Sequence, residues 1–270
     1  MTTRRLLRRF ILVIASIALA IVLAFAYVVF IDESRDFNNE LKAAERGDAG
    51  AQFNLGEMFY NGEGATFGWL RKQDYSQAAK WFGKSAEQGN AKAQFSLGWM
   101  YDNGEGVAQD YNQAIGFYKK AAELGYEDAQ FNLGEIYRVG EGVAKNDSEA
   151  VKWYAKAAEQ GHASAQCKLG VMYHLGRGIT QDYNESLKWF RKSAELGDAE
   201  AQNILGWIFA DGNGVPQDYV EAYKWTTLAA EQGEPNAAEE RDALKKKMSP
   251  QQIAKAQVLA KEFKSHNNTK

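Results

Sequence analysis

The sequence predicts an all-α fold, a solenoid built from pairs of helices. Three observations support this prediction. An Ala-Gln dipeptide recurs along the chain with a spacing of 36 residues over most of its length. Each interval holds two apolar stripes with helical periodicity. Glycines and helix-capping residues separate the stripes at matching positions. A repeat of this length is typical of stacked helix pairs, each of which buries its apolar face against its neighbours.

The repeated units are defined by their Ala-Gln starts. Their spacings are 42, 36, 36, 36 and 36 residues, and a degenerate sixth unit closes the series; the starts are Ala51, Ala93, Ala129, Ala165, Ala201 and Ala237. The first unit is longer by six residues because residues 66–72 (TFGWLRK) enlarge its loop. The sequence on either side of this insertion stays in register.

Each unit contains two amphipathic stretches, here named helix A and helix B in chain order. In the second unit, helix A carries apolar residues at i, i+4, i+7 and i+8, namely Ala93, Leu97, Met100 and Tyr101. Helix B carries them at i, i+3, i+4, i+7 and i+8, namely Ala114, Phe117, Tyr118, Ala121 and Ala122. Both spacings place the apolar side chains on one helical face.

Glycines form three regular sets. One set lies inside helix A, where glycine costs about 1 kcal/mol relative to alanine, so we expect a neighbouring helix to approach closely there; it is Gly56, Gly98, Gly134, Gly170 and Gly206. The second set follows helix A and comprises Gly62, Gly104, Gly140, Gly176 and Gly212. The third set follows helix B and comprises Gly89, Gly125, Gly161, Gly197 and Gly233. The last two sets predict left-handed helix ends.

The start of each helix B matches the capping-box pattern, in which an Asp or Asn is followed three residues later by Gln or Glu. The capping residues are Asp74, Asp110, Asn146, Asp182 and Asp218, and their partners are Gln77, Gln113, Glu149, Glu185 and Glu221. Each cap is expected to contribute about 1 kcal/mol.

Together these residues resemble the Sel-1-like repeat, a relative of the tetratricopeptide repeat, through the motif A-Q-x-x-L-G-x-x-[YF]-x-x-G-x-G-V-x-x-[DN]-Y-x-x-A-x-x-W-[YF]-x-x-A-A-E-x-G. The resemblance covers residues 37–264, with a half-unit cap at 37–50 and a C-terminal cap at 237–264. It implies a right-handed α-α superhelix. It also implies an adaptor that scaffolds protein complexes.

The N-terminus predicts a membrane anchor. A basic tail (1–9) with four arginines precedes 22 uncharged residues (10–31), and a short linker (32–36) follows. At about 1.5 Å per residue such a helix spans the roughly 30 Å apolar core of a bilayer. The arginines place the N-terminus in the cytoplasm and the repeats on the periplasmic or extracytoplasmic side. The alternative is a cleaved signal peptide with an A-x-A site at residues 24–26, which leaves the repeats on the same side but secreted.

Composition limits the functions that can be expected. Four of the 32 basic residues lie in the first 31 positions, which leaves 28 against 35 acidic residues, a net charge of −7. An acidic body disfavours nucleic acid as a partner. A single cysteine, Cys167, excludes a disulfide framework and a cysteine-cluster metal site. Common hydrolytic, redox and phosphate-binding motifs are absent. We therefore expect no catalytic residues, no cofactor and no metal site.

Candidate partner-binding residues lie on helix A, which lines the concave surface in helical repeats of this kind. Columns off its apolar stripe vary between units and supply Asn54, Glu57, Ser96, Trp99, Asn132, Glu135, Arg138, Lys168, His174 and Trp207. Trp99 and Trp207 would be aromatic anchors, or they would pack against adjoining helices. Trp69 in the insertion is a further candidate for a lipid or protein contact, unless its loop folds back on its own repeat.

The expected function is a membrane-anchored scaffold that binds a partner protein or peptide on its concave face. An envelope glycan is the alternative ligand, because an exported aromatic groove also suits a cell-wall polysaccharide. A hydrolase is the weakest hypothesis. The tail at 265–270 carries no assigned role.

Overall fold

The computed structural model describes residues 35–62 and 72–267 of the 270-residue chain. All regular secondary structure in these two ranges is helical. The apolar stretch at 10–31 and Trp69 lie outside the described residues. Among the residues described, no helix is both long enough and apolar enough to cross a membrane.

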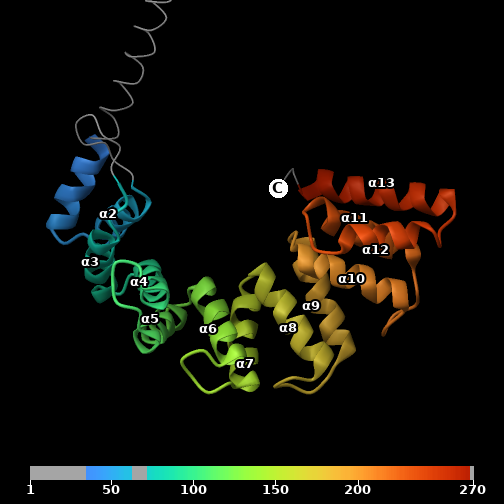
Figure 1. Cartoon of the computed structure of the whole chain (residues 1–270), viewed down its shortest axis with the longest axis horizontal. Helices are drawn as coiled ribbons and strands as arrows, with labels where there is room; N and C mark the ends of the chain where they lie inside the picture. Colours follow the sequence, from blue (N-terminus) through green and yellow to red (C-terminus); the bar gives the residue numbers. More distant parts are fainter. Residues whose placement is uncertain (1–34, 63–71, 268–270) are drawn as a thin grey trace, which may run out of the picture. The chain divides into compact units, whose positions relative to one another are not determined.

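Ten consecutive helices of 13 residues form the repeats (Figure 1). The A helices are α2 (Ala49–Asn61), α4 (Ala91–Asn103), α6 (Glu127–Val139), α8 (Ala163–Leu175) and α10 (Ala199–Asp211). The B helices are α3 (Tyr75–Glu87), α5 (Tyr111–Glu123), α7 (Asp147–Glu159), α9 (Tyr183–Glu195) and α11 (Tyr219–Glu231). A helix at 35–45 precedes them, and α12 (Ala237–Lys245) and α13 (Pro250–Asn267) follow. The predicted all-α fold of helix pairs is confirmed.

The chain divides into two compact units, one ending at Phe117 and the other beginning at Tyr118, so the division falls within α5. Unit 1 has a core built around Leu55, Phe82 and Met100. Unit 2 has a core that includes Tyr154 and Phe190. Within each unit, every A helix packs against the B helix that follows it, as α2 does on α3 and α10 on α11.

Glycines inside the A helices allow the close helix approach that the sequence predicts. A Cβ atom on Gly170 would lie 2.8 Å from the Phe190 ring, and one on Gly56 would lie 2.6 Å from the Phe82 ring. Real side chains do not approach this closely, so only glycine accommodates the aromatic ring. The contacting ring belongs to the residue directly after the tryptophan column of helix B.

The glutamine of each Ala-Gln pair is buried and links successive helices. Its Nε2 donates to a backbone carbonyl of the preceding B helix, or of the helix at 35–45, at 3.0–3.1 Å; the pairs are Gln52 to Ala44, Gln94 to Ala86, Gln130 to Ala122, Gln166 to Ala158 and Gln202 to Ala194. These bonds satisfy carbonyls near a helix end, which have no partner within their own helix.

The capping box at the start of helix B is only half formed, so that prediction was partly wrong. Asp182 Oδ1 accepts hydrogen bonds from the Asn184 and Glu185 N–H groups, as a cap should. The return bond from Glu185 is absent, because the Asp182 N–H donates to the Tyr173 carbonyl at 3.1 Å. Glu185 pairs instead with Lys188 at 3.0 Å.

The loop between the two helices of a unit rests on the preceding unit. Gly106 has φ +71°, and a Cβ there would lie 2.3 Å from the Tyr75 backbone at the start of α3. Ser76 Oγ donates to the Gly106 carbonyl at 3.4 Å. The loop glycine is therefore required by a backbone contact as well as by its left-handed conformation.

Both ends of the array carry extra helices. At the N-terminal end, Phe37 and Ala44 pack in one cluster with Leu55. At the other end α13 covers α11, and the rings of Phe263 and Trp225 meet edge to face at 5.2 Å.

A complete capping box opens α13. The Ser249 N–H donates to the Gln252 Oε1 atom at 2.9 Å, and the Gln252 N–H donates back to the Ser249 Oγ atom at 3.3 Å. This box contrasts with the half-formed caps of helix B.

Candidate functional site

The variable columns of the A helices form a surface that we call the helix-A face, made by α2 and α4 in unit 1 and by α6, α8 and α10 in unit 2. Both predicted anchors are open to solvent on it. Trp99 of α4 is 43% exposed and Trp207 of α10 is 58% exposed, so adjoining helices enclose neither ring. Exposed tryptophan is uncommon enough on a soluble domain to mark a contact surface.

In unit 1 an aromatic hollow of about 230 Å³ lies between α2, α3 and α4. It brings together the predicted residues Glu57, Ser96 and Trp99 with Tyr60, Phe82 and Phe95. Sequence reasoning assigned Phe82 and Phe95 to helix packing alone, because their spacing is that of the apolar stripe. Only the packing of three helices shows that their ring edges also line a surface hollow.

Tyr60 is held in place at this hollow. Its hydroxyl donates to Glu105 Oε2 at 2.7 Å, and its ring packs against that of Tyr75 at a centroid distance of 5.1 Å. Burial and the Glu105 carboxylate raise the pKa of Tyr60 to about 12, while a hydrogen bond with Trp99 acts in the opposite direction. Tyr60 is therefore a neutral donor at physiological pH, and it links Trp99 to an acidic group.

A second, more polar hollow of about 620 Å³ adjoins the first and shares Glu57 with it. Its lining includes Asp36 and Glu40 from the helix at 35–45 and Asn54 from α2. The Asn54 amide donates to Glu40 Oε1 at 3.3 Å. The four candidates predicted in unit 1 thus lie around two neighbouring hollows.

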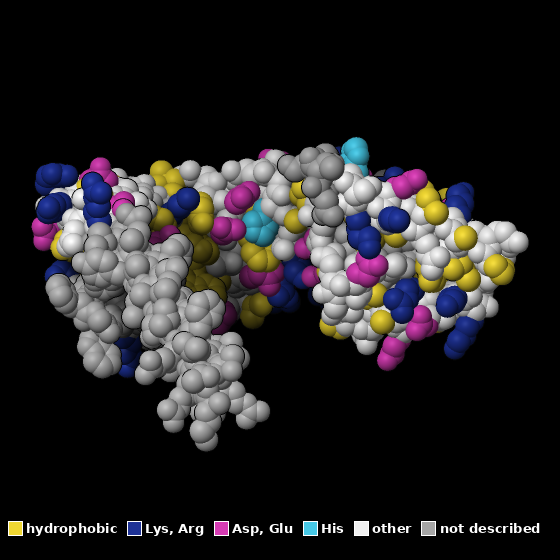
Figure 2. Space-filling view, turned by 90° about the horizontal axis from the view of Figure 1, so that it is seen from above, with side chains coloured by type: hydrophobic (Ala, Val, Ile, Leu, Met, Phe, Trp, Pro, Cys, Tyr) yellow, Lys and Arg dark blue, Asp and Glu magenta, His cyan; other side chains and the backbone are white. Residues whose placement is uncertain are grey.

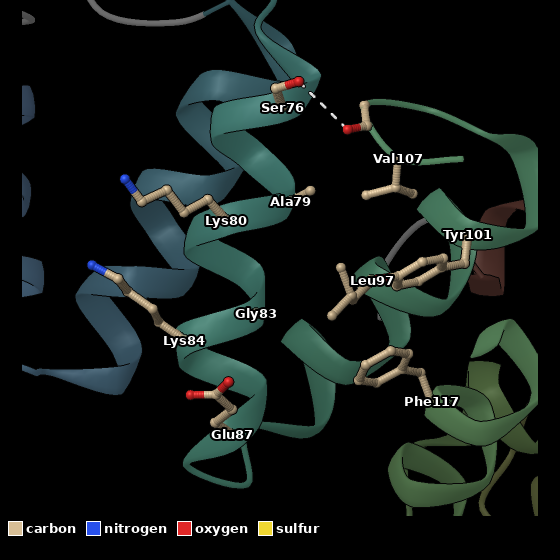
Figure 3. A pocket seen from close by; sticks show the side chains of 11 residues that line it. Ser76, Ala79, Lys80, Gly83, Lys84, Glu87, Leu97, Tyr101, Val107 and Phe117 are labelled. Carbon is tan, nitrogen blue, oxygen red and sulfur yellow. Dashed lines mark hydrogen bonds between the residues drawn. The ribbon is translucent and has the colours of Figure 1, made fainter. Parts of the chain in front are cut away.

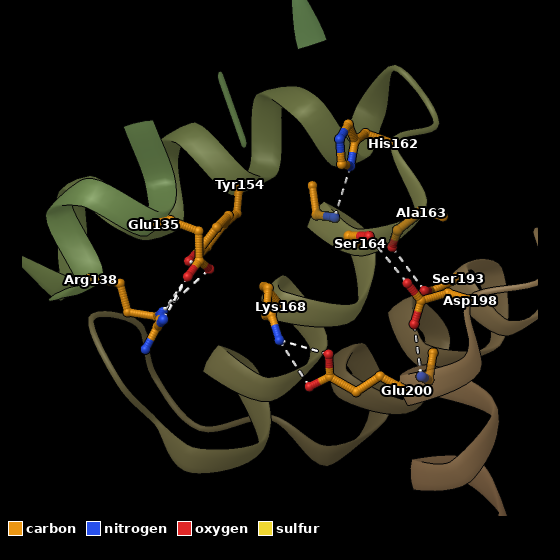
Figure 4. A network of polar contacts seen from close by, with 12 residues as sticks. Glu135, Arg138, Tyr154, His162, Ala163, Ser164, Lys168, Ser193, Asp198 and Glu200 are labelled. Carbon is orange, nitrogen blue, oxygen red and sulfur yellow. Dashed lines mark hydrogen bonds and ion pairs between the residues drawn. The ribbon is translucent and has the colours of Figure 1, made fainter. Parts of the chain in front are cut away.

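In unit 2 the helix-A face carries a network of polar contacts (Figure 4). Glu135 of α6 accepts hydrogen bonds from Arg138, with a shortest contact of 2.5 Å, and from the Tyr154 hydroxyl of α7. Burial alone would raise the pKa of Glu135, but the bonds from Arg138 and Tyr154 outweigh it, so the pKa lies below its usual value. Burial and Glu135 both raise the pKa of Tyr154.

A second ion pair joins α8 to α10. Lys168 Nζ lies 2.7 and 2.9 Å from the two carboxylate oxygens of Glu200. Burial would lower the pKa of Lys168, but contact with Glu200 raises it above its usual value. The predicted candidates Glu135, Arg138 and Lys168 are thus already neutralised by partners within the chain.

The remaining predicted residues lie apart from this network. His174 sits near the end of α8, where its ring meets that of Tyr183 edge to face at 5.3 Å and its carbonyl accepts a hydrogen bond from Gln181. Asn132 of α6 is half-buried. These positions vary between repeats, as binding residues do, but His174 belongs to the local structure of its loop.

His162 was interpreted from the sequence as a surface or packing residue, and the structure gives it a definite role. It occupies the N-cap of α8, where its Nδ1 accepts the Ala165 N–H at 3.1 Å. Its Nε2 lies 3.3 Å from the Asp128 carboxylate, and its ring stacks on Phe131. The equivalent positions Asp48, Asn90 and Asp198 cap their helices in the same way.

Cys167 is fully buried, and burial raises its pKa above the usual range for a thiol. A buried, protonated thiol is a poor nucleophile, which agrees with the expected packing role. Among the described residues, no group of three or more His, Cys, Asp and Glu side chains is placed to hold a metal ion.

A third hollow, of about 470 Å³, lies away from the predicted site, between α3 and the stacked rings of Tyr101 and Phe117 (Figure 3). The side chains of Lys80 and Lys84 point away from these rings. Lys84 Nζ instead lies 4.0 Å from the centre of the Trp81 ring. No candidate from the sequence lines this hollow.

Lysine and arginine side chains are interspersed with aspartate and glutamate on the face drawn in Figure 2. Such mixing lacks the concentrated basic surface that nucleic-acid backbones require.

Comparisons with known proteins agree with this architecture. A crystal structure of a Sel1 repeat protein from Oxalobacter formigenes is similar with a TM-score of 0.68 and 31% identity, over 85% of this chain and 99% of that one. Another similar structure is c5321, a protective antigen of uropathogenic Escherichia coli with an SLR fold. It has a TM-score of 0.55 and 33% identity, over 86% of this chain and 56% of that one. No relative was found among curated protein sequences.

The family model described as "Sel1 repeat" matches five consecutive segments: residues 49–90, 91–126, 127–162, 163–198 and 199–234. Each match begins at or next to the first residue of an A helix and runs through the following B helix. The matched segments cover more than half of the sequence, and the chain belongs to the Sel1 repeat family.

Proposed function

We propose that this protein is a membrane-anchored scaffold that binds a partner protein or peptide along the helix-A face. Proteins with Sel1 repeats are generally protein-interaction scaffolds and are typically non-enzymatic. The observation that carries the proposal is Trp99, a tryptophan 43% exposed at the edge of an aromatic hollow. An exposed aromatic ring beside a preformed hollow is typical of the anchoring residues of protein interfaces.

Crosslinking in the native membrane tests the interface. A photoreactive amino acid at position 96, beside the aromatic hollow, should capture a discrete partner, whereas the same group at the exposed position Glu159 on α7 should not. Trp99→Ala combined with Trp207→Ala should reduce capture at position 96 by at least about tenfold, since buried aromatic anchors contribute 2 kcal/mol or more. Equal capture by the double variant would remove the helix-A face as the binding surface.

The anchor is a separate part of the proposal. It rests on the 22 uncharged residues at 10–31 and on the four arginines before them. We expect the full chain to remain in the membrane fraction after a carbonate wash and the repeats to be digested by protease added from the extracytoplasmic side. Release of a shortened chain into the soluble fraction would favour signal cleavage instead.

A further inference from the structure

The two hollows of unit 1 form a continuous acidic and aromatic surface. The polar hollow contributes Asp36 and Glu40, the aromatic hollow contributes Trp99, and Glu57 belongs to both. None of the described residues that line either hollow is Lys, Arg or His. Its chemistry therefore differs from that of the mixed surface elsewhere.

Internal repetition allows a comparison of this surface with unit 2. Glu57 occupies the same column of helix A as Glu135. In unit 2 that carboxylate is held by Arg138 and by Tyr154, and Lys168 lies near enough to lower its pKa. The matching positions in unit 1 hold Tyr60, Phe82 and Ser96. No cationic side chain therefore stands in unit 1 at either place where unit 2 supplies one.

The replacements also change the shape of the site. Tyr60 turns its hydroxyl toward Glu105, while Phe82 and Ser96 are smaller or less polar than their counterparts and line the hollow of about 230 Å³. The hollow therefore adjoins the position at which the Arg138 guanidinium meets Glu135 in unit 2. A guanidinium suits such a place, because its planar fork binds a carboxylate at two points and stacks on aromatic rings.

We propose that the aromatic hollow of unit 1 binds an arginine side chain, or less tightly a lysine side chain, of a basic segment in the partner protein. The cation lies between the Glu57 carboxylate and the Trp99 ring, and Asp36 and Glu40 attract further basic residues beside it. This inference rests on the proposed function and names the chemical class of the partner. An acidic peptide is repelled from the same surface.

Selection from a library of random nonapeptides displayed on phage tests the proposal, with the full chain solubilised in a non-ionic detergent as bait. Peptides enriched by the unaltered protein should be rich in arginine and lysine. In a direct titration, replacing the arginines of an enriched peptide by citrulline, which keeps the shape but removes the charge, should weaken binding at least about tenfold. Higher salt should weaken the arginine form more than the citrulline form.

Two variants locate the effect. Glu57→Gln removes the carboxylate and should cancel most of the difference between arginine and citrulline peptides. Tyr60→Arg recreates in unit 1 the i, i+3 pair that Glu135 and Arg138 form in unit 2, and should block basic peptides by occupying Glu57. Glu159→Gln removes the same charge from an exposed site on α7 and should leave binding unchanged. Circular dichroism should show the same helix content for all three.

The outcomes separate this inference from the proposed function. Enrichment of neutral or acidic peptides, equal binding of citrulline peptides, or no peptide enrichment at all would overturn the inference. If enriched peptides lack basic residues but lose binding with Trp99→Ala, the helix-A face still binds peptides and only the assigned chemistry is wrong. Retention of an envelope polysaccharide in place of any peptide would overturn both and favour the glycan hypothesis.

Discussion

Residues at the ends of the B helices decide whether the buried glutamines are fully satisfied. In three repeats a second glutamine donates to the Oε1 atom of the first at 2.7–2.9 Å; the donors are Gln88, Gln160 and Gln232. Leu196 stands at this position in the fourth repeat, and there Gln166 Oε1 is buried with no hydrogen-bond partner among the described residues. A buried acceptor without a donor lowers stability.

We expect Leu196→Gln to raise the free energy of unfolding by about 1 kcal/mol, because it supplies the missing donor. Leu196 is 57% exposed, so the substitution removes little buried apolar surface. Urea denaturation followed by circular dichroism measures the change. The reverse substitution, Gln160→Leu, should destabilise the protein by a similar amount, because it strips the same donor from Gln130. A Leu196→Gln variant no more stable than the parent would refute this account.

Helical glycines separate into two classes that the sequence alone does not distinguish. Gly170→Ala should destabilise the protein by about 1–3 kcal/mol, because the new methyl group overlaps the Phe190 ring. Gly116 on α5 has open space where its Cβ would lie, so Gly116→Ala should stabilise the protein by up to about 1 kcal/mol through helix propensity. Thermal unfolding of the pair should show opposite shifts, and a shift of the same sign would contradict this assignment.

At the scale of the helices, the caps show which half of a sequence motif is used. Asp182 caps α9, whereas Glu185 does not return to the cap because the Tyr173 carbonyl has already accepted the Asp182 N–H. This competing carbonyl comes from the preceding A helix. The pattern of residues is therefore the same as in a complete capping box, and only the packing of α8 on α9 decides between them.

Asp182→Ala is expected to lower the free energy of unfolding by about 1 kcal/mol, because two N–H groups lose their acceptor. Glu185→Ala should cost no more than a few tenths of a kcal/mol, since only an exposed pair with Lys188 is lost. Chemical denaturation of both variants provides the comparison. Equal losses would indicate that Glu185 closes the capping box in solution.

For the molecule as a whole, stability depends on covering the apolar faces at the ends of the array. Ala256 and Ala260 of α13 are buried against the cluster that includes Leu244 and Met248, and Phe263 packs beside it. The C-terminal helix is amphipathic in sequence because it closes an apolar surface that has no further repeat to cover it.

Removal of residues 250–270 should uncover Trp225 and its neighbours, increase the fluorescence of an added hydrophobic dye and promote self-association. Removal of residues 268–270 alone provides a length control and should change neither property. Dye binding and light scattering measure the two effects. A monodisperse protein with unchanged dye binding after the longer deletion would show that α13 is dispensable for the fold.

Much of the fold was accessible from the sequence because repetition turns weak local patterns into strong ones. The left-handed glycines that end the A helices, such as Gly104 and Gly176, follow directly from their recurrence and are confirmed by their φ angles of +71° and +64°. In the site, the exposure of Trp99 and Trp207 on helix A agrees with the assignment of their column to the surface. Those features depend on residues close together in the chain.

The sequence by itself determined the helix pairs, their boundaries and the column of each candidate residue, since helical periodicity and capping are local properties. Only the tertiary structure decided which columns share contacts. It showed that Glu135 is neutralised by Arg138 and Tyr154, and that Glu57 instead adjoins an aromatic hollow. Hydrogen bonds and hollows between helices depend on side chains from two or three elements at once, and no single stretch of sequence contains them.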